Sequence, residues 1–522
     1  MKLLTRDRMR EIDRLTSMNF KIPSLLLMEN AGGAVVEYIK SNIPDYPKKR
    51  YTVFCGSGNN GGDGAVIARK LFQLDCPVRV VFTSDISKAD GDNKTNFDIL
   101  RAVGVPTHFA RDGAEWENAK MPAMTGDVLI DAIFGIGFRG EPDEYLAWIF
   151  DSLNERNRER QTLIAVDIPS GVYADGGRAE TAIFADTTVT FGAPKLGMAD
   201  YPGRENCGKM VTARIDFPEE LLEAEDIDLS IMTDDDARRM FRPRKPDSHK
   251  GSYGHLLVAA GEPGMFGAAA IAAEASLRAG AGLVTVLTQE ELRAGFEARL
   301  PEAMLIPYSS AEKLDMKTLL KRLEAEIGKR KVKTAAAGNG WGTDDFRREL
   351  LEFLIELPAL GLLVLDADAL NIIAENRNLL NKIRDCDKTV VMTPHIGEMA
   401  RLTRLDIAEV KETKLRLAMK FARKYRVWLV LKDAVTVIAE PSGKAWYQPF
   451  GSSALAKGGS GDVLCGLIAG LLASGYPPLD SALMGSFLLG RAGEKYSEEF
   501  SDTGALSRDL LNEVQGVFRE LV

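Results

Sequence analysis

The chain contains two successive series in which short runs of apolar and β-branched residues alternate with longer helical patterns. The first series begins at Tyr51 with YTVFC and continues through AVIARKLFQL, VRVVF and TNFDILRAVG. Such alternation is typical of β-α-β units, whose strands form a parallel sheet with helices on its faces. The second series begins with HLLVAAG at residue 255 and continues towards the end of the chain. This pattern predicts the α/β class for both halves.

A break in the pattern divides the chain. Residues 216–251 contain few strand-like runs, a cluster of acidic residues and then a basic segment punctuated by prolines. Domain boundaries fall in segments of this kind, so we expect one between residues 220 and 240. A length of 522 residues fits two large domains or three to four small ones, at roughly 100 to 200 residues for an ordinary domain. We predict one domain over residues 1–220 and a second over residues 235–522.

The composition of the chain argues against some classes of binding partner. Lys and Arg number 66 against 75 Asp and Glu, so the formal charge is −9 and no basic excess attracts nucleic acid or anionic lipid. The most apolar stretch, residues 463–473, is about half the roughly 20 residues that span a bilayer. The five cysteines form no C-x-x-C pair, and the N-terminus lacks the apolar segment of a secretory signal. We therefore expect a cytoplasmic protein without nucleic-acid or membrane partners.

The first glycine-rich turn lies between a predicted strand and a predicted helix. Residues 56–64 read GSGNNGGDG and contain a formal G-x-G-x-x-G. Glycines let backbone N–H groups approach a phosphate at a helix N-terminus, although a tight turn without a ligand has the same pattern. A turn has no need of the two asparagines and the aspartate, so their side chains are candidate ligands.

Three further polar residues follow the next predicted strands of this series. Asp131, Asp167 and Ser170 lie near strand ends, where the ligand crevice of an open parallel sheet is found. The fold would gather them with Asn60 around one crevice. Oxygen atoms of Asn, Asp and Ser suit a hard cation, and a remaining carboxylate is available for acid–base chemistry. Each aspartate taken alone also fits a helix cap or a turn.

Four segments of this half, in the same order, resemble the NAD(P)H-hydrate epimerase domain: IPSLLLMENAG at 22, GSGNNGGDG at 56, DAIFGIGFRGE at 131 and DIPSG at 167. The resemblance covers about residues 1–215 and implies a Rossmann-like, doubly wound α/β/α fold. It implies that the hydrated nucleotide binds to Asn59, Asn60, Gly61, Gly62 and Asp63. Its phosphates would lie against Gly135, Ile136, Gly137, Phe138, Arg139, Gly140 and Glu141. The resemblance also implies a catalytic Asp167 facing the nicotinamide ring, and potassium at Asn60, Asp131 and Ser170.

A second glycine-rich turn opens an apolar helix near the C-terminus. Gly458-Gly459-Ser460-Gly461-Asp462 offers backbone N–H groups to an anion and a carboxylate in the first helical turn. An aspartate at this place also serves as a simple helix cap. The segments LLVLDADALN at 362, TPHIGE at 393 and LKDAVTVI at 431 add an acid pair, a histidine and a lysine to the same predicted sheet. His395 alone fits a core or capping residue, and Lys432 alone fits a solvated surface.

These segments, with HKGSYGHLLVAAG at 249 and GMFGAAAIAAEASLRAGAGLVTV at 264, resemble the NAD(P)H-hydrate dehydratase domain. The resemblance runs from about residue 235 to the end and implies a ribokinase-like α/β/α fold. It implies that the hydrated nucleotide contacts Ala268, Gly340, His395 and Asp462, the last of which would be the catalytic base. It implies that the adenine nucleotide contacts Lys432, Asp433, Ala434, Val435, Thr436 and Gly461. The implied phosphoryl donor is ADP with Mg²⁺.

Two positions depart from the dehydratase pattern. The lysine turn, usually Lys-Gly, reads Lys432-Asp433 and places a negative charge where phosphates are expected. The segment before the glycine turn, usually Asn-Pro-Gly-Met-Ala, reads Ser452-Ser453-Ala454-Leu455-Ala456. The extra carboxylate of Asp433 therefore opposes the binding of phosphates at this turn.

We interpret the chain as a bifunctional enzyme that repairs hydrated NADH and NADPH, whose ring carries a hydroxyl at C6 in an R or an S form. The N-terminal half would exchange the epimers. The C-terminal half would phosphorylate the S form with ADP and expel phosphate, which restores the dihydronicotinamide and releases AMP.

Two alternatives come from other classes of function. A ribokinase-like kinase for a vitamin precursor shares the glycine–aspartate motif of the second half. A non-catalytic, ligand-sensing module would suit the first half, although the polar residues of its predicted crevice argue against this. We expect a homo-oligomer, and the alanine-rich helix over residues 267–279 fits burial within its own domain as well as contact with another subunit.

Overall fold

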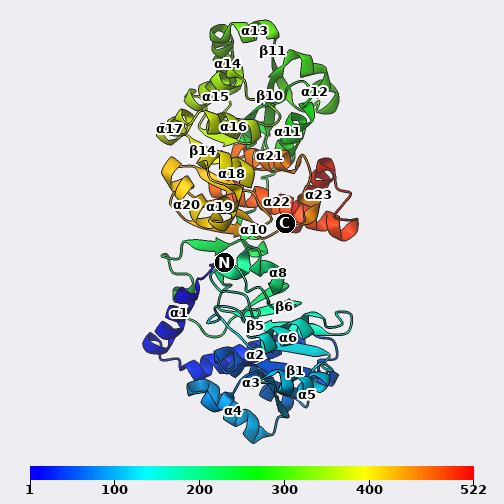
Figure 1. Ribbon diagram of the computed structural model, residues 1–522. Helices are drawn as coiled ribbons and strands as arrows, with labels where there is room; N and C mark the ends of the chain where they lie inside the picture. The colour runs from blue at the N-terminus through cyan, green and yellow to red at the C-terminus, as the bar shows by residue number, and fades with distance from the viewer. The chain divides into compact units, whose positions relative to one another are not determined.

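The computed structural model describes residues 1–522, apart from the side chains of Lys88, Ser310 and Leu314. The chain forms two compact units, Met1–Leu229 and Ser230–Val522 (Figure 1). The units have separate sheets and separate hydrophobic cores. Each core is built from the apolar strand runs and helix faces of its own half of the sequence.

The first unit contains a seven-stranded parallel sheet with the order β3-β2-β1-β4-β5-β6-β7. Strand order reverses between β1 and β4, so the crevice of this doubly wound sheet is expected at their carboxyl ends. The strands are β1 (Tyr51–Cys55), β2 (Val78–Phe82), β3 (Thr107–Phe109), β4 (Val128–Ala132), β5 (Thr162–Val166), β6 (Thr187–Phe191) and β7 (Lys209–Ala213).

Helices cover both faces of this sheet. Successive residues of a strand point to opposite faces, so Val53 and Cys55 join the core beneath α2, α3 and α4, whereas Phe54 joins the core beneath α5 and α6. The helices are α1 (Arg6–Asn19), α2 (Ser24–Asn42), α3 (Asn59–Gln73), α4 (Gly91–Val103), α5 (Gly113–Ala123), α6 (Glu144–Asn154), α7 (Leu196–Ala199), α8 (Gly203–Cys207), α9 (Glu219–Leu222) and the short 3₁₀ segments η1 (Tyr46–Lys48) and η2 (Ile86–Lys88).

The turn from β1 into α3 requires glycine at two positions. A Cβ on Gly56 would lie 2.1 Å from the carbonyl oxygen of Ile133, and a Cβ on Gly61 would lie 1.9 Å from that of Gly56. Because a side chain at either position would collide with backbone, these glycines let the first turn of α3 sit directly on the ends of β1 and β4. The asparagines of the turn are thereby placed at the crevice.

The second unit contains a ten-stranded sheet with the order β11-β10-β9-β12-β13-β14-β15-β16-β17-β8. Strands β9 to β15 are parallel to one another, whereas β16 pairs with β15, and β17 with β16, in antiparallel orientation. The predicted α/β class is therefore confirmed. The strands are β8 (Leu229–Ile231), β9 (His255–Ala259), β10 (Leu283–Gln289), β11 (Met304–Tyr308), β12 (Thr334–Ala337), β13 (Leu362–Leu365), β14 (Thr389–Met392), β15 (Trp428–Leu431), β16 (Thr436–Ala439) and β17 (Ala445–Gln448).

The helices of this unit surround the sheet. They are α10 (Asp234–Met240), α11 (Phe266–Arg278), α12 (Arg293–Arg299), α13 (Ser310–Leu314), α14 (Met316–Arg330), α15 (Asp345–Glu356), α16 (Ala367–Glu375), α17 (Asn378–Asp385), α18 (Ile396–Thr403), α19 (Ile407–Glu412), α20 (Lys414–Tyr425), α21 (Ser460–Ala473), α22 (Pro478–Glu499) and α23 (Ser507–Glu520). Three 3₁₀ segments, η3 (Lys250–Tyr253), η4 (Glu290–Leu292) and η5 (Ser453–Leu455), complete it.

The alanine-rich segment forms α11 and packs against α21 within its own unit. A Cβ on Gly466 of α21 would lie 2.3 Å from the carbonyl oxygen of Ala272 and 2.6 Å from the Cβ of Ala275. Small residues on both helices therefore permit a backbone contact that larger side chains would prevent. Close packing inside the unit accounts for the alanine pattern.

Residues 216–251 contain more regular structure than the sequence predicts. Strand β8 and helix α10 both lie there, and α10 begins with a capping box. The Thr233 hydroxyl accepts a hydrogen bond from the Asp236 N–H, and the Asp236 carboxylate accepts one from the Thr233 N–H. A three-residue strand is too short to show periodicity, and the acidic residues that cap the helix resemble a solvated linker.

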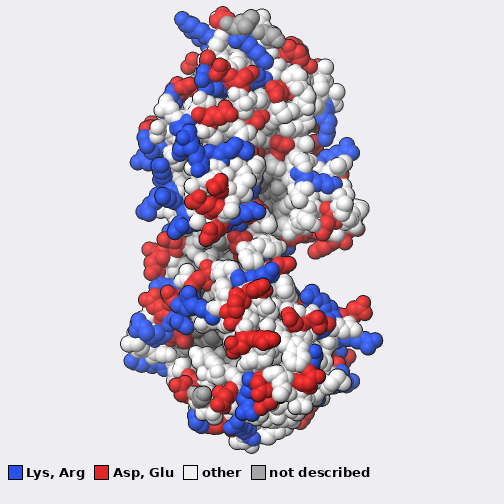
Figure 2. Space-filling model, viewed as in Figure 1, with Lys and Arg blue, Asp and Glu red and all other residues white. Residues whose placement is uncertain are grey.

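The surface carries charges of both signs. Basic and acidic side chains are interspersed over the face shown in Figure 2. Among the residues that the structure describes, no helix is long and apolar enough to span a bilayer. All five cysteines are free, and four of them are buried.

Candidate active sites

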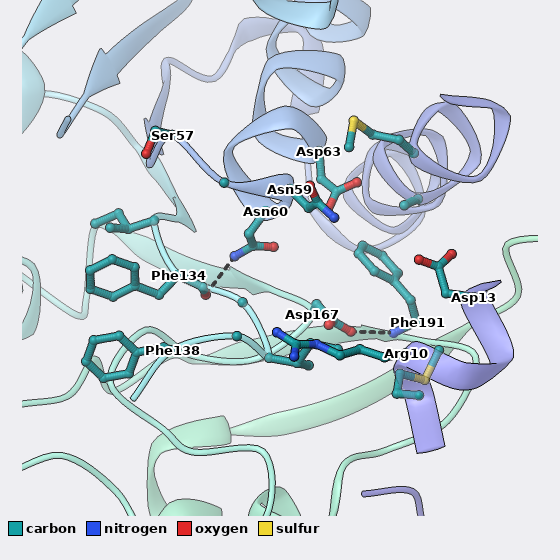
Figure 3. A pocket seen from close by; sticks show the side chains of 18 of the residues that line it. Arg10, Asp13, Ser57, Asn59, Asn60, Asp63, Phe134, Phe138, Asp167 and Phe191 are labelled. Carbon is teal, nitrogen blue, oxygen red and sulfur yellow. Dashed lines mark hydrogen bonds between the residues drawn. The ribbon is translucent and has the colours of Figure 1, made fainter. Parts of the chain in front are cut away.

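A cavity of about 870 Å³ opens at the carboxyl ends of β1, β4 and β5 in the first unit (Figure 3). Its walls come from the first turn of α3, the loop after β4, the residues after β5 and the inner faces of α1 and α2. Small-molecule sites commonly measure roughly 300–1,000 Å³. The topological reversal of the sheet therefore coincides with a cavity large enough for a nucleotide.

The predicted turn at the start of α3 divides into two sets of residues. Asn59, Asn60 and Asp63 line the cavity. Gly61 lies under the end of β1, and a Cβ on Gly62 would lie 2.7 Å from both the Asn93 Oδ1 and the Met28 Sδ atoms, so these two glycines serve packing. Burial raises the pKa of the Asp63 carboxyl well above its usual range, and the charges of Asp167 and Asp13 add to the effect.

The three predicted cation ligands lie in one buried network. The Ser170 hydroxyl donates to Asp131 Oδ1 at 2.6 Å, and the Ser170 N–H donates to Asp131 Oδ2 at 2.8 Å. The Asn60 amide donates to the carbonyl oxygen of Phe134 at 2.8 Å, while the Phe134 N–H donates to Ser170 Oγ at 2.9 Å. Burial raises the pKa of Asp131 to about 6, although the hydrogen bonds from Ser170 and Ile133 oppose this shift.

This network has the chemistry of a monovalent cation site. The Asn60 Oδ1 atom is buried and lacks a hydrogen-bond partner among the described residues, so it has an unused acceptor. Carbonyl, carboxylate and hydroxyl oxygens of Phe134, Asp131 and Ser170 stand in the same network. Hard cations prefer such neutral and anionic oxygens, so the residues present fit potassium.

Asp167 is held at the cavity by a lysine that the sequence motifs did not single out. Its Oδ1 atom accepts hydrogen bonds from the fully buried Lys195 ammonium and from the Phe191 N–H, the latter at 3.0 Å. Asp167 also has a φ of +65°, an uncommon value for a residue with a side chain. Lys195 belongs to the segment TTVTFGAPKLG, residues 187–197. Its position shortly after an apolar strand run is the one feature of the sequence that could have identified it as a site residue.

Only the first part of the loop after β4 lines the cavity. The residues from Gly135 to Arg139 line it, and the rings of Phe134 and Phe138 stack at 4.4 Å between centroids. Gly140 and Glu141 turn away, because the Gly140 carbonyl accepts from the Tyr173 hydroxyl and Glu141 accepts from the Glu180 N–H. The first part of the predicted phosphate loop is therefore available to a ligand in this cavity.

Helix α1 supplies residues that the motifs did not identify. Arg10 and Asp13, three positions apart and so on one face of the helix, both line the cavity. Burial raises the pKa of Asp13, and the charge of Asp92 adds to this. Arg and Asp residues recur throughout the first fifteen positions, so nothing in the sequence distinguishes these two.

In the second unit, Asp462 stands in the first turn of α21. Its Oδ1 atom accepts a hydrogen bond of 2.7 Å from the Asn339 side-chain amide, which also donates to Asp366 Oδ2 at 3.3 Å. Burial raises the pKa of Asp462 to about 6, against the effect of the Asn339 hydrogen bond. Asn339 is fully buried and precedes the predicted Gly340, but it was not predicted itself.

Lys432, which follows β15, contacts the Asp366 carboxylate at the end of β13. Its ammonium donates to Asp366 Oδ1 at 2.8 Å, and a Cβ on Gly461 would lie 3.4 Å from the same nitrogen. Burial lowers the pKa of Lys432, but the charges of Asp366 and Glu398 outweigh it and leave the pKa raised. Glu398 is itself buried, which raises its pKa to about 7. The structure thus brings Lys432, Gly461 and Asp462 together around Asp366.

The other predicted substrate contacts come from the residues after β12 and β14, the two strands beside β13, and from α11. His395 caps α18, and its Nδ1 atom accepts from the N–H groups of Gly397 and Glu398. Burial and the nearby Lys432 charge lower the pKa of His395, so the ring is neutral at pH 7 with its Nε2 as the donor. A Cβ on Gly340 would lie 3.0 Å from that of Ala268, so these two positions are adjacent.

Asp433, the unusual residue of the lysine turn, has a partner. Its Oδ2 atom lies 3.1 Å from the ammonium of Lys414, a residue of α20 that is 5% exposed. The same ammonium donates to the Val435 carbonyl oxygen at 3.0 Å. The turn that continues through Ala434 to Thr436 is therefore fixed by a buried cation, which also offsets the extra negative charge.

The second departure, residues 452–456, contains the 3₁₀ segment η5. The Ser497 hydroxyl donates to Ser452 Oγ at 2.8 Å, and the Ala454 side chain is fully buried. The Ser460 hydroxyl donates to the Leu455 carbonyl oxygen at 2.6 Å, which ties the segment to the start of α21. Local hydrogen bonds thus hold the segment in place without the usual proline and glycine.

Known proteins resemble the chain over its whole length. A family model described as NAD(P)H-hydrate dehydratase matches residues 256–516, and one described as YjeF-related protein N-terminus matches residues 24–197. A Moorella thermoacetica protein named bifunctional NAD(P)H-hydrate repair enzyme Nnr is 36% identical over 531 residues, covering 100% of this chain and 97% of that protein. Its namesake from Thermofilum pendens is 34% identical over 529 residues, with the same coverage.

Among solved structures, the chain is similar to an ADP/ATP-dependent NAD(P)H-hydrate dehydratase from Bacillus subtilis, co-crystallised with ATP and Mg²⁺. The identity is 27% and the TM-score 0.49, over 56% of this chain and 99% of that one.

Each unit gathers ionisable side chains at the carboxyl edge of a parallel sheet, so the chain is an α/β protein with two candidate active sites. The full-length similarity then determines the family: the chain belongs to the bifunctional NAD(P)H-hydrate repair enzymes. The interpretation as a repair enzyme with an epimerase half and a dehydratase half is confirmed. The vitamin kinase and the non-catalytic module are set aside.

The Asp433–Lys414 pair predicts that restoring the usual glycine destabilises this protein. Asp433→Gly removes the carboxylate that offsets a buried ammonium, so we expect the free energy of unfolding of the second unit to fall by about 1–3 kcal/mol. Chemical denaturation followed by circular dichroism measures this change.

A double-mutant cycle with Lys414→Met provides the control, because the loss at Asp433 should shrink once the lysine is gone. An Asp433→Gly chain as stable as the unsubstituted protein would show that the pair does not fix the turn.

Proposed function

We propose that the two units carry out one repair sequence. The first interconverts the R and S forms of hydrated NADH and NADPH, and the second dehydrates the S form with a phosphoryl donor. One observation, common to both units, carries this proposal. At the carboxyl edge of each sheet a carboxylate is bound by a buried donor: Asp167 by Lys195, and Asp462, in the first turn of α21, by Asn339.

In the first unit, the chemistry requires loss and return of the oxygen at C6. The ring nitrogen lone pair expels that oxygen as water, and water then adds to the opposite face of the ring. Asp167 faces the cavity and would handle the proton that leaves and returns with the oxygen. Lys195 would orient the carboxylate, because its ammonium is fully buried and bound to the same oxygen atom.

Potassium is the cation we propose for the first unit. Asn60, Asp131 and Ser170 would hold it, and the unused Asn60 Oδ1 supports this choice. When bound, the ion supplies positive charge that balances the buried Asp131 and favours substrate phosphates nearby. The substrate itself would contact Asn59, Asp63 and the residues Gly135, Ile136, Gly137, Phe138 and Arg139, with Gly61, Gly62, Gly140 and Glu141 shaping these loops.

In the second unit, we propose that Asp462 removes the proton from the C6 hydroxyl of the S form as that oxygen attacks the terminal phosphorus of the donor. The phosphate ester then leaves as inorganic phosphate, driven by the ring nitrogen, and a proton is lost from the neighbouring carbon. Lys432 and the N–H of Gly461 would stabilise the charge on the phosphoryl oxygens. Ala268, Gly340 and His395 would contact the substrate.

We propose ADP with Mg²⁺ as the donor, giving AMP. The fused order, epimerase first, is the arrangement of the ADP-using family members that the sequence resembles. Mg²⁺ would accompany the donor's phosphates and offset their charge. Asp433, Ala434, Val435 and Thr436 would contact the adenine nucleotide, and the pairing of Asp433 with Lys414 supports this because it lowers the repulsion of phosphates.

We also propose a cellular compartment and an oligomeric state. The five free cysteines support a reducing compartment such as the cytoplasm. A homo-oligomer is the assembly we propose, and sedimentation of the purified chain tests it.

The two activities should be separable. Asp462→Asn removes the base, so we expect nucleotide-dependent dehydration to fall by at least about a hundredfold while epimer exchange persists. Asp167→Asn should leave repair of the S form intact and slow repair of the R form to its spontaneous rate. The return of dihydronicotinamide absorbance measures the first activity, and chromatographic separation of the epimers measures the second.

Asp151→Asn is a matched control, since Asp151 is an exposed residue of α6 that does not line the cavity of the first unit. Near-normal dehydration by Asp462→Asn would remove that residue from the mechanism, and unchanged epimer exchange by Asp167→Asn would do the same for Asp167.

Epimer exchange should depend on potassium. Replacing K⁺ by tetramethylammonium leaves the Asn60 and Asp131 oxygens without a cation that fits between them, so we expect exchange to slow while dehydration of the S form continues. Asn60→Ala should raise the K⁺ concentration needed for half-maximal exchange. Exchange that is indifferent to the cation in the unsubstituted protein contradicts the site.

The donor is tested by dehydration with purified ADP and with ATP freed of ADP. We expect faster turnover with ADP and stoichiometric AMP, because ADP is the proposed donor and a donor with one phosphate fewer needs a shorter span between the adenine contacts and Gly461. Faster turnover with ATP, accompanied by ADP release, would overturn the choice of donor and leave the repair activity standing.

A further inference from the structure

The cavity of the first unit is lined by more acids than bases. Its acidic residues are Asp13, Asp63, Asp92, Asp143 and Asp167, and its basic residues are Arg10, Arg139 and Lys195. Hydrated NADH carries a pyrophosphate, and hydrated NADPH carries a further phosphate. The substrate's anionic groups therefore have to be placed away from the carboxylates and beside an available cation.

Two of the three cations are already engaged. Lys195 is fully buried, and its ammonium contacts Asp167, Thr190 Oγ1 at 2.8 Å and the Phe191 carbonyl oxygen at 3.2 Å. Arg139 has a side chain that is 64% exposed and lies 3.7 Å from Asp175. Lys195 is thus fully engaged, and Arg139 has a carboxylate nearby, which leaves Arg10 as the cavity-lining cation without a carboxylate partner.

Arg10 has the geometry of an unpaired anion-binding residue. Figure 3 shows its side chain extending from α1 into the cavity, towards the loop that carries Phe138. A Cβ on Gly137 would lie 3.4 Å from Arg10 Nη2, so the guanidinium stands over bare backbone of that loop. Within the part of the chain that the structure describes, no hydrogen bond or ion pair engages this guanidinium.

The loop beneath Arg10 suits a phosphate group. A Cβ on Gly137 would meet only Arg10 within 4 Å, so this glycine leaves room above the backbone, and a guanidinium offers planar, paired donors that match phosphate oxygens. The match to the family model begins at residue 24, so α1 lies outside it. Arg10 is therefore found from the folded cavity rather than from a motif.

We propose that Arg10 binds the pyrophosphate of the hydrated nucleotide over the Gly135–Gly137 segment. This inference rests on the proposed epimerase function of the cavity. By holding the pyrophosphate at this wall, Arg10 orients the nicotinamide ring towards Asp167 and away from the acidic residues of α3 and α4. It is a binding residue and takes no part in the proton transfer.

Arg10→Gln tests the proposal. For the R hydrate of NADH, we expect KM to rise about tenfold to a hundredfold, the loss typical of a charge-assisted hydrogen bond, with kcat changed less than about threefold. Inorganic pyrophosphate should inhibit exchange by the unsubstituted protein competitively, and its inhibition constant should rise by at least tenfold in the variant. Arg10→Lys should fall between the two, since it keeps the charge and loses the paired donors.

A phosphate-free substrate separates binding from structure. The KM for hydrated, reduced nicotinamide riboside should be the same in Arg10→Gln and in the unsubstituted protein. Arg14→Gln is the matched control, because Arg14 lies one turn further along α1, contacts Met18 and does not line the cavity. Thermal melting checks that both variants fold.

Two results would overturn the role of Arg10: an unchanged KM for the dinucleotide with unchanged pyrophosphate inhibition, or an equal loss with the riboside. Failure of the proposed function looks different, because the unsubstituted protein would then exchange no epimers at all.

Discussion

Burying a carboxylate is costly unless fixed donors surround it, and both units of this protein are organised around that constraint. Asp131 is fully buried and accepts three hydrogen bonds from Ser170 and Ile133, yet burial still raises its pKa to about 6. Asp366 is 2% exposed and accepts from Lys432 and Asn339. Each site exists because parallel strands deliver these acids and their donors to the same edge of a sheet.

The raised pKa of Asp131 has a consequence for stability. Its folded-state pKa lies above its ordinary value of 3.8, so the stabilisation from this group is fully present below about pH 4 and is lost as pH rises through about 6. At neutral pH the ionised carboxylate therefore opposes folding of the first unit. A cation beside Asn60 and Asp131 would relieve that cost, which links the proposed potassium site to stability as well as to substrate binding.

The sequence predicts the strands and the motif residues well, because both are local. Apolar runs mark the strands, and polar residues at or shortly after the strand ends mark the crevice, as with Asn60, Asp131 and Ser170 in one network. The residues that bind these carboxylates could not be predicted in the same way. Lys195 is 28 residues from Asp167, and Asn339 is 123 residues from Asp462. Only tertiary packing shows which lysine or asparagine among many meets a given acid.

Asp433 shows that the effect of a charged residue on a site depends on its neighbours in the folded chain. Read alone, it places a negative group where phosphates are expected, but Lys414 from another helix lies 3.1 Å away. Similarly, the acidic residues in the first turn of α10 resemble a linker in the sequence, whereas in the structure Thr233 and Asp236 form a capping box. In both cases the missing information is a contact between side chains, which depends on the backbone geometry of the folded chain.

The pH dependence of kcat for dehydration of the S hydrate, at saturating donor, tests most directly whether a buried, tuned carboxylate drives this chemistry. Asp462 faces Asn339, Asp366, Lys432 and Asp368, and its pKa of about 6 predicts a rate that falls about tenfold per pH unit below that value. In Asn339→Ala the carboxylate loses the hydrogen bond that favours its charged form, so the fall should begin at higher pH. A rate that stays level from about pH 7 to about pH 4.5, or a midpoint unmoved by the Asn339 substitution, would contradict the account.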